Sequence, residues 1–304
     1  MDSPTTFISV ACHSFSGSTL LAMLLNAHPE IATVSEMDGP NARLVDTKGY
    51  VCSCGQLIRE CSFWDQVSSE MQARGYVFSP TDFQVAFGDR GLRDRLRYGS
   101  LGSNPPEAIR DAIEQLIPGH KARLDGLIAR NEALVQSVLT VTGKRVFVDT
   151  SKNTRRFKYM SRHSSLDVRV VLMVRDARGS VVSQMRHMDR SVAKAAEAWT
   201  KGVAGIIRVW KQLPEDKRTV IKYEDLCRDT QATLQGLYRF FGADPSFEVD
   251  LAALPPHHII GNSTRMRQIT QIRLDERWKR VLSPEQLETV RRIAGRQNQG
   301  FGYR

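Results

Sequence analysis

The first 30 residues constrain most strongly what this chain can fold into. Residues 7–12 are a short apolar run typical of a buried strand, residues 13–19 are mostly small and polar, and residues 20–25 are strong helix formers. A strand, a tight turn and a helix in this order open an α/β nucleotide-binding unit. Backbone N–H groups in such a turn, together with the positive end of the next helix, attract an anion.

The remaining elements predict an α/β fold, with a central, mostly parallel sheet flanked by helices. The apolar run at 168–174 is rich in β-branched residues, as central parallel strands are. Ligands of such sheets bind outside the carboxyl ends of the strands. We expect one domain over residues 1–304, with 38–142 as a helical insertion on the substrate side. Further strands are expected at 32–34, 145–148 and 219–221, and helices at 105–141, 191–212 and 224–241.

The net charge of +10 is concentrated in two stretches of the chain. Residues 151–190 hold ten Lys and Arg against three Asp and Glu, and residues 255–304 hold ten against four. Such clustering predicts an anionic partner, which can be a nucleic acid, a phosphorylated cofactor or an acidic substrate.

The apolar segments are too short for a transmembrane helix. The first residues also lack the pattern of a signal peptide. These two absences predict a cytoplasmic protein.

Three of the five cysteines, Cys52, Cys54 and Cys61, lie close together in the sequence. An odd and modest number of cysteines does not predict a disulfide scaffold. A structural zinc site usually has four ligands, and no fourth ligand lies near these three in the sequence. We therefore expect packed thiols and no metal.

The turn after the first strand is not a Walker A motif, because no lysine follows Gly17. This disfavours a metal-dependent kinase or ATPase. A second signal lies at the end of the run 168–174, where Arg175 is followed eight residues later by Ser183. A guanidinium and a hydroxyl in these positions can hold one phosphate.

At these positions the chain resembles sulfotransferases that use 3′-phosphoadenosine-5′-phosphosulfate (PAPS). Their phosphosulfate loop reads Lys/Arg-x-Gly-Ser/Thr-Ser/Thr, similar to residues 15–19, and their 3′-phosphate motif reads Arg-Asp-Pro/Ala with a serine eight positions after the arginine. Four further segments resemble blocks of bacterial and carbohydrate-type members: 149–152, 221–226, 258–265 and 300–303.

The resemblance implies a sulfotransferase fold of the P-loop-nucleotide-hydrolase type. It also implies transfer of a sulfuryl group from PAPS to a hydroxyl or amine acceptor, with 3′,5′-adenosine diphosphate (PAP) as product and no metal. The implied contacts fall into three groups: Ser14, Phe15, Ser16, Gly17, Ser18, Thr19 and Leu20 at the 5′-phosphosulfate; Arg175, Ser183 and His187 at the 3′-phosphate; and Tyr223, Asn262 and Arg265 around the nucleotide.

One position departs from the family pattern. Phe15 stands where these enzymes carry a lysine or arginine near the oxygen that bridges phosphate and sulfate. Lys152 or His13 is the expected substitute cation. By its similarity to tyrosylprotein sulfotransferases, Glu36 is implied as the base that takes the proton of the acceptor.

Two alternative functions remain open from the sequence. One is a catalytically silent nucleotide-binding module of the same fold, which the departure at Phe15 favours. The other is a basic nucleic-acid-binding protein, although residues 255–304 offer only three aromatic side chains for base stacking. We expect no nucleic-acid partner. The acceptor stays open among small molecules, sugars, lipids and peptides.

Overall fold

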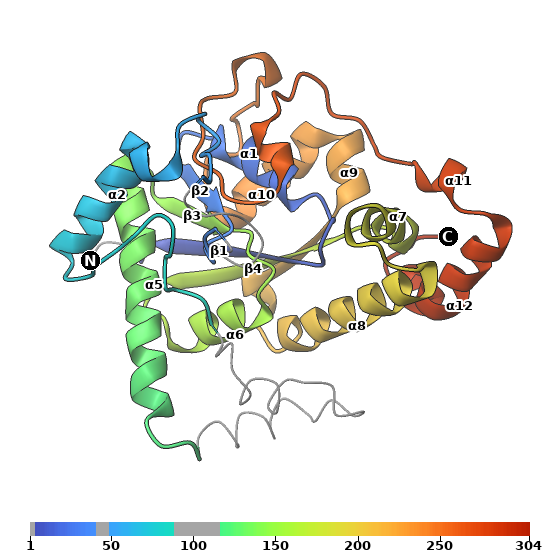
Figure 1. Ribbon diagram of the computed structural model, residues 1–304, viewed down its shortest axis with the longest axis horizontal. Coiled ribbons are helices and arrows are strands. Elements are labelled where there is room, and N and C mark those ends of the chain that lie inside the picture. Colours follow the sequence, from blue (N-terminus) through green and yellow to red (C-terminus); the bar gives the residue numbers. More distant parts are fainter. Residues whose placement is uncertain (1–3, 41–48, 88–115) are drawn as a thin grey trace.

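Five parallel strands form the central sheet of the computed structural model, which describes residues 4–40, 49–87 and 116–304 (Figure 1). The strands lie in the order β2-β3-β1-β4-β5, and every pairing is parallel. Their bounds are Thr6–Cys12 (β1), Ile31–Ser35 (β2), Val146–Asp149 (β3), Asp167–Val174 (β4) and Arg218–Lys222 (β5). The predicted α/β class with a central parallel sheet is confirmed.

Helices cover both faces of the sheet. Ile8 and Val10 of β1 pack toward α1 (Ser18–Asn26) and α10 (Thr230–Phe241), which lie above the sheet in Figure 1. Phe7 and Ala11 point to the opposite face and pack against the layer that includes α5 (His120–Thr142), α6 (Thr154–His163) and α8 (Val192–Trp210). The other described α-helices are α2 (Ser62–Ala73), α7 (Ala177–Met188), α9 (Tyr223–Arg228), α11 (Trp278–Val281) and α12 (Pro284–Gly300). None of the described helices has both the length and the apolar character needed to cross a bilayer.

Two predicted helices have different bounds in the structure. The helix expected at 224–241 is divided into α9 and α10, because the Asp229 side chain accepts a hydrogen bond from the Ala232 N–H and starts a new helix. The helix expected at 105–141 is described from His120, and it ends at Gly143, whose φ of 66° suits a glycine. Residues 105–115 lie outside the described residues.

The segment 38–142 is described in part, since 41–48 and 88–115 also lie outside the described residues. Helices α2 and α5 of this segment share an apolar cluster with strand residues such as Phe7, Val34 and Phe147. Their packing therefore contributes to the main core of the protein.

The strand order places the topological switch point of the sheet, where ligands of such folds bind in a crevice, between β1 and β4. The chain leaving β1 leads through α1 to β2 on one side of the sheet, whereas the chain leaving β4 leads through α7 and α8 to β5 on the other side. Adjacent strands whose connections diverge in this way leave an opening at their carboxyl ends. The predicted anion loop follows β1, and Arg175 follows β4, so both border this opening.

Candidate active site

The loop between β1 and α1 lets a ligand approach the backbone closely. Gly17 has a φ of 92°, and a Cβ atom built on it would lie 2.5 Å from the ring of Tyr223. A glycine is therefore required both by the backbone conformation and by the neighbouring ring. The first turn of α1 begins at Ser18 without a side-chain cap, so its N–H groups are available to an anion. The hydroxyl-bearing residues Ser18 and Thr19 are buried at this helix start.

Arg175 lies beside this loop and is only 6% exposed. Its Nη1 donates to the Phe15 carbonyl oxygen at 2.9 Å, and its Nη2 donates to Asp275 Oδ2 at 2.9 Å. The guanidinium carbon lies 4.5 Å from the centre of the Tyr223 ring. The guanidinium thus stands at the crevice, and a carboxylate now occupies the place of an anionic partner. Hydrogen bonds from Arg277 and from Arg175 hold the pKa of Asp275 well below its usual range.

Helix α7 lies along the same loop. The ring of His187 stacks on the ring of Phe15 with 5.5 Å between their centres. The Ser180 hydroxyl donates to the Ser14 carbonyl oxygen at 3.5 Å. Ser183 lies on this helix, buried, and its hydroxyl donates to the Gly179 carbonyl oxygen one turn back at 3.0 Å. Of the residues predicted for the 3′-phosphate, Arg175 and His187 therefore contact Phe15 of the loop, and Ser183 lies on the same helix as His187.

Glu36 and Lys152 meet at the carboxyl ends of β2 and β3. Their side chains form an ion pair between Lys152 Nζ and Glu36 Oε1. Burial lowers the pKa of Lys152, but the charge of Glu36 and its hydrogen bond outweigh burial, and the pKa lies above its ordinary value. The ammonium is therefore charged at neutral pH.

A buried carboxylate fixes the backbone on both sides of this pair. Asp149 Oδ1 accepts hydrogen bonds from the Met37 N–H at 3.2 Å, from the Ser151 N–H at 2.9 Å and from the Ser151 hydroxyl at 2.6 Å. Met37 follows Glu36, and Ser151 precedes Lys152. One side chain thus orders both members of the ion pair.

His13, the other candidate for the missing loop cation, is in a different environment. Burial lowers its pKa below the ordinary value of histidine. Its Nδ1 lies 3.2 Å from the Ser14 carbonyl oxygen, and a Cβ on Gly202 of α8 would come within 2.5 Å of its ring. The imidazole is packed and neutral at pH 7, whereas Lys152 is charged.

The two residues predicted around the nucleotide from the loop before α11, Asn262 and Arg265, have different partners in the structure. Asn262 Nδ2 donates to Thr19 Oγ1 at 3.1 Å, which joins this loop to the start of α1. Arg265 contacts other partners: its Nε donates to the Tyr50 hydroxyl at 3.0 Å, and its Nη2 donates to the Val51 carbonyl oxygen at 2.9 Å. The structure therefore places Arg265 against the segment that starts at residue 49.

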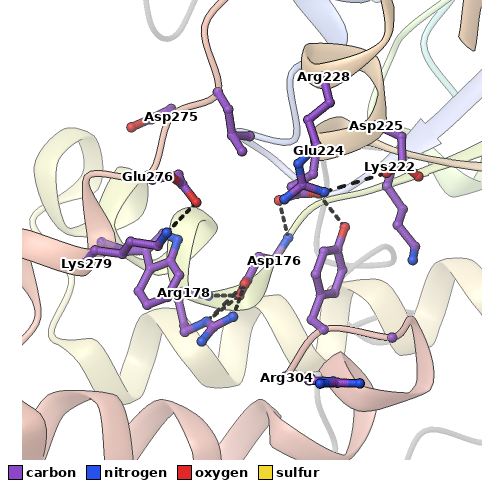
Figure 2. Close-up of a pocket in the computed structure, with 14 residues that line it drawn as sticks. Asp176, Arg178, Lys222, Glu224, Asp225, Arg228, Asp275, Glu276, Lys279 and Arg304 are labelled. Atoms are coloured by element: carbon purple, nitrogen blue, oxygen red, sulfur yellow. Dashed lines mark hydrogen bonds and ion pairs between the residues drawn. The ribbon is translucent and has the colours of Figure 1, made fainter.

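Sequence reasoning missed Asp275, the acid that pairs with Arg175. Its neighbourhood is a charged hollow of about 340 Å³, shown in Figure 2. There the Glu224 carboxylate accepts hydrogen bonds from the Asp176 N–H at 3.1 Å and from the Tyr303 hydroxyl at 2.6 Å. These bonds tie the ends of β4 and β5 to the last residues of the chain. The sequence signal that could have indicated Asp275 is its position as an acidic residue within the basic stretch 255–304.

The structure adds a fourth donor to the three cysteines, which were expected as packed thiols without a metal. Cys52, Cys54 and Cys61 do lie together, but they have a fourth donor, His258, which comes from the loop before Asn262. The sequence separation of about 200 residues concealed this histidine.

Comparisons with known proteins agree with this architecture. No curated protein sequence matches the chain. Among solved structures, the sulfotransferase domain of the Synechococcus PCC 7002 olefin synthase is similar with a TM-score of 0.51 and 18% identity, over 97% of this chain and 96% of that one. The sulfotransferase domain from the curacin biosynthetic pathway gives a TM-score of 0.50 and 15% identity, over 100% and 99%. These likenesses show the fold.

The family follows from the sequence. The model of the sulfotransferase family matches residues 95–247, just over half of the chain. With the matching fold, this establishes that the chain belongs to the sulfotransferase family.

Proposed function

We propose that this protein transfers the sulfuryl group of PAPS to a hydroxyl or amine acceptor and releases PAP. One juxtaposition carries the proposal. The anion loop with Arg175 lies on one side of the carboxyl end of β1, and the Lys152–Glu36 ion pair lies on the other side. A nucleotide held by the first group would therefore present its sulfate to the second.

The donor nucleotide would be held mainly by the main chain and one arginine. The first-turn N–H groups of α1, with the hydroxyls of Ser18 and Thr19, would bind the 5′-phosphosulfate. Arg175 would bind the 3′-phosphate, with Ser183 and His187 beside it. Arg175 would exchange the Asp275 carboxylate for the phosphate, so that the buried guanidinium keeps an anionic partner in both states.

The transfer step requires a proton acceptor and a cation. The acceptor oxygen or nitrogen attacks the sulfur, and the bond between sulfur and the bridging oxygen breaks. The proton of the acceptor passes to the Glu36 carboxylate, and the negative charge passes to the departing PAP. Lys152 would leave Glu36 for the bridging oxygen, where charge develops, and this would free the carboxylate to take the proton. His13 is unsuited to this role, because burial keeps it neutral.

A catalytically silent nucleotide-binding protein is the second candidate. Two observations favour it: Phe15 provides no cation in the loop, and Asp275 already pairs with Arg175. Such a protein would bind PAP but transfer no sulfate to any acceptor.

The binding half of the proposal is tested by calorimetry with two ligands. PAP carries the 3′-phosphate, and adenosine 5′-phosphosulfate lacks it. Arg175→Ala should weaken the binding of PAP by about 1.5–3 kcal/mol, or roughly 10- to 150-fold, and leave adenosine 5′-phosphosulfate unchanged. Arg291→Ala is the matched control, since Arg291 pairs with Glu288 on the exposed surface of α12. Equal weakening of both ligands would remove Arg175 from this role.

The transfer half is tested with sulfate-labelled PAPS and a panel of small-molecule, sugar, lipid and peptide acceptors. Labelled product with one acceptor class supports the enzyme and identifies that class. Tight PAP binding without labelled product in any class supports the silent protein.

A further inference from the structure

None of the four residues of the Cys3His cluster is among the groups proposed to act in sulfuryl transfer. Its four donor atoms, the sulfurs of Cys52, Cys54 and Cys61 and a ring nitrogen of His258, all lie within 4.8 Å of one another. His258 Nδ1 is 3.4 Å from Cys52 Sγ and 3.3 Å from Cys61 Sγ, and the sulfurs of Cys54 and Cys61 are 3.6 Å apart.

These separations match the edges of a zinc-centred tetrahedron. With Zn–S bonds of about 2.3 Å and a Zn–N bond of about 2.0 Å, neighbouring ligand atoms in a tetrahedral site are about 3.5–3.8 Å apart. Three of the six separations, at 3.3–3.6 Å, are slightly shorter than this, and all six are within 4.8 Å. Four donors can therefore surround one ion with little movement.

Cys52 lies in a defined turn, and Cys61 lies at the start of a helix. Val51 and Leu57 form an antiparallel bridge, and the Cys52 N–H donates to the Gln56 carbonyl oxygen at 2.7 Å. Gly55, with a φ of 94°, closes this turn after Cys54. Cys61 immediately precedes α2.

Hydrogen bonds to Ser53 hold the backbone on both sides of His258. The Ser53 hydroxyl donates to the His257 carbonyl oxygen at 2.7 Å and accepts from the Ile259 N–H at 2.8 Å. The ring of His258 stacks on the ring of Phe63 with 4.2 Å between centres. Residues next to the thiols thus orient the imidazole, as the surroundings of metal sites commonly do for their ligands.

We propose that Cys52, Cys54, Cys61 and His258 bind one structural zinc ion. Four protein ligands leave no open position for a substrate, so the ion would hold the fold and take no part in transfer. Binding would release the three thiol protons and leave a site of net charge −1. The guanidinium of Arg265, which donates to the Val51 carbonyl next to Cys52, places a positive charge beside it.

The ion would fasten two segments that are about 200 residues apart. His258 lies four residues before Asn262, whose side chain contacts Thr19 at the start of α1. Zinc would therefore fix the loop that reaches over the nucleotide site. The proposal does not depend on the donor being PAPS, because the four ligands and the readouts below are separate from that site.

The full chain, purified under reducing conditions and without a metal-affinity column, should carry about one zinc per molecule by elemental mass spectrometry. Cys61→Ser and His258→Ala should each lose at least tenfold in bound zinc. Cys227→Ser and His163→Ala are the matched controls, since neither residue belongs to the cluster, and both should keep the ion. Less than about a tenth of a zinc per wild-type chain, or equal loss in the controls, would overturn the proposal.

A second measurement avoids variants that fail to fold. Cobalt exchanged into the wild-type protein should give thiolate-to-metal charge-transfer absorption and the visible bands of a tetrahedral site. A cobalt spectrum without thiolate bands would contradict the proposal. So would a disulfide between Cys54 and Cys61 in the freshly purified chain, found by mass spectrometry in place of metal.

Discussion

The two sides of the β1 strand end are built in different ways. We call the side with the anion loop, Arg175 and α7 the donor side. These parts follow directly from β1 and β4. Most of the contacts expected there come from the backbone and one guanidinium. We call the side with Glu36 and Lys152 the transfer side. These two residues are 116 residues apart in the chain, and their side chains form a pair. The difference teaches that the donor side should respond to changes in backbone shape as well as to the loss of Arg175, whereas the transfer side should respond to the loss of single side-chain charges.

The largest expected effect is on the transfer side. Lys152→Ala should lower kcat by about 10²–10³-fold and change the KM for PAPS far less, because the cation stabilises charge that develops mainly in the transition state. The rate is measured with the acceptor class that the panel identifies. Lys201→Ala on the exposed surface of α8 is the control, and it should leave kcat unchanged. A kcat within about threefold of wild type would place the cation elsewhere.

The backbone shape of the loop should also affect binding on the donor side. Gly17→Ala places a Cβ against the Tyr223 ring in a backbone conformation that costs an alanine about 1–2 kcal/mol. The shifted loop should bind PAP at least roughly tenfold more weakly in calorimetry. Gly205→Ala in α8, where the added Cβ meets nothing within 4 Å, is the control. Unchanged affinity in the Gly17 variant would show that the loop tolerates a different shape.

A smaller effect is expected from the acid that pairs with Arg175. If Asp275 competes with the 3′-phosphate for Arg175, as proposed, Asp275→Asn should bind PAP more tightly, by up to about fivefold for a partly exposed pair. Adenosine 5′-phosphosulfate should bind as before. If PAP instead binds more weakly to this variant, Asp275 supports the nucleotide site and does not compete for it.

The smallest effect is a pH dependence of stability from the same pair. The folded-state pKa of Asp275 is lowered by Arg277 and Arg175, so its stabilising contribution is present above the unfolded pKa of about 3.9 and is lost as the pH falls through the folded value. The difference in Tm between wild type and Asp275→Asn should be constant above about pH 5 and shrink below pH 3.9. A difference that grows on acidification would contradict this sign.

The donor side could be predicted from the sequence because its motifs are local. Residues 13–19 and Arg175 each follow an apolar strand directly, and the ends of adjacent parallel strands meet. The pairing of Glu36 with Lys152 could not be predicted, because it depends on β2 lying next to β3, and spacing does not give strand order. The proximity of His258 to the three cysteines could not be predicted for a similar reason, because only the folded loop brings this histidine near them. Arg265 was expected at the nucleotide, but it bonds to Tyr50 and Val51.

The measurement that tests the central claim most directly is the rescue of Lys152→Ala by Phe15→Arg. If Lys152 supplies the cation that the loop lacks, an arginine at position 15 should restore part of the lost kcat in the Lys152→Ala background. The same arginine should add little to the wild-type chain, since two cations would repel each other in one small site. An equal gain in both backgrounds, or no gain in the Lys152→Ala background, would contradict the account.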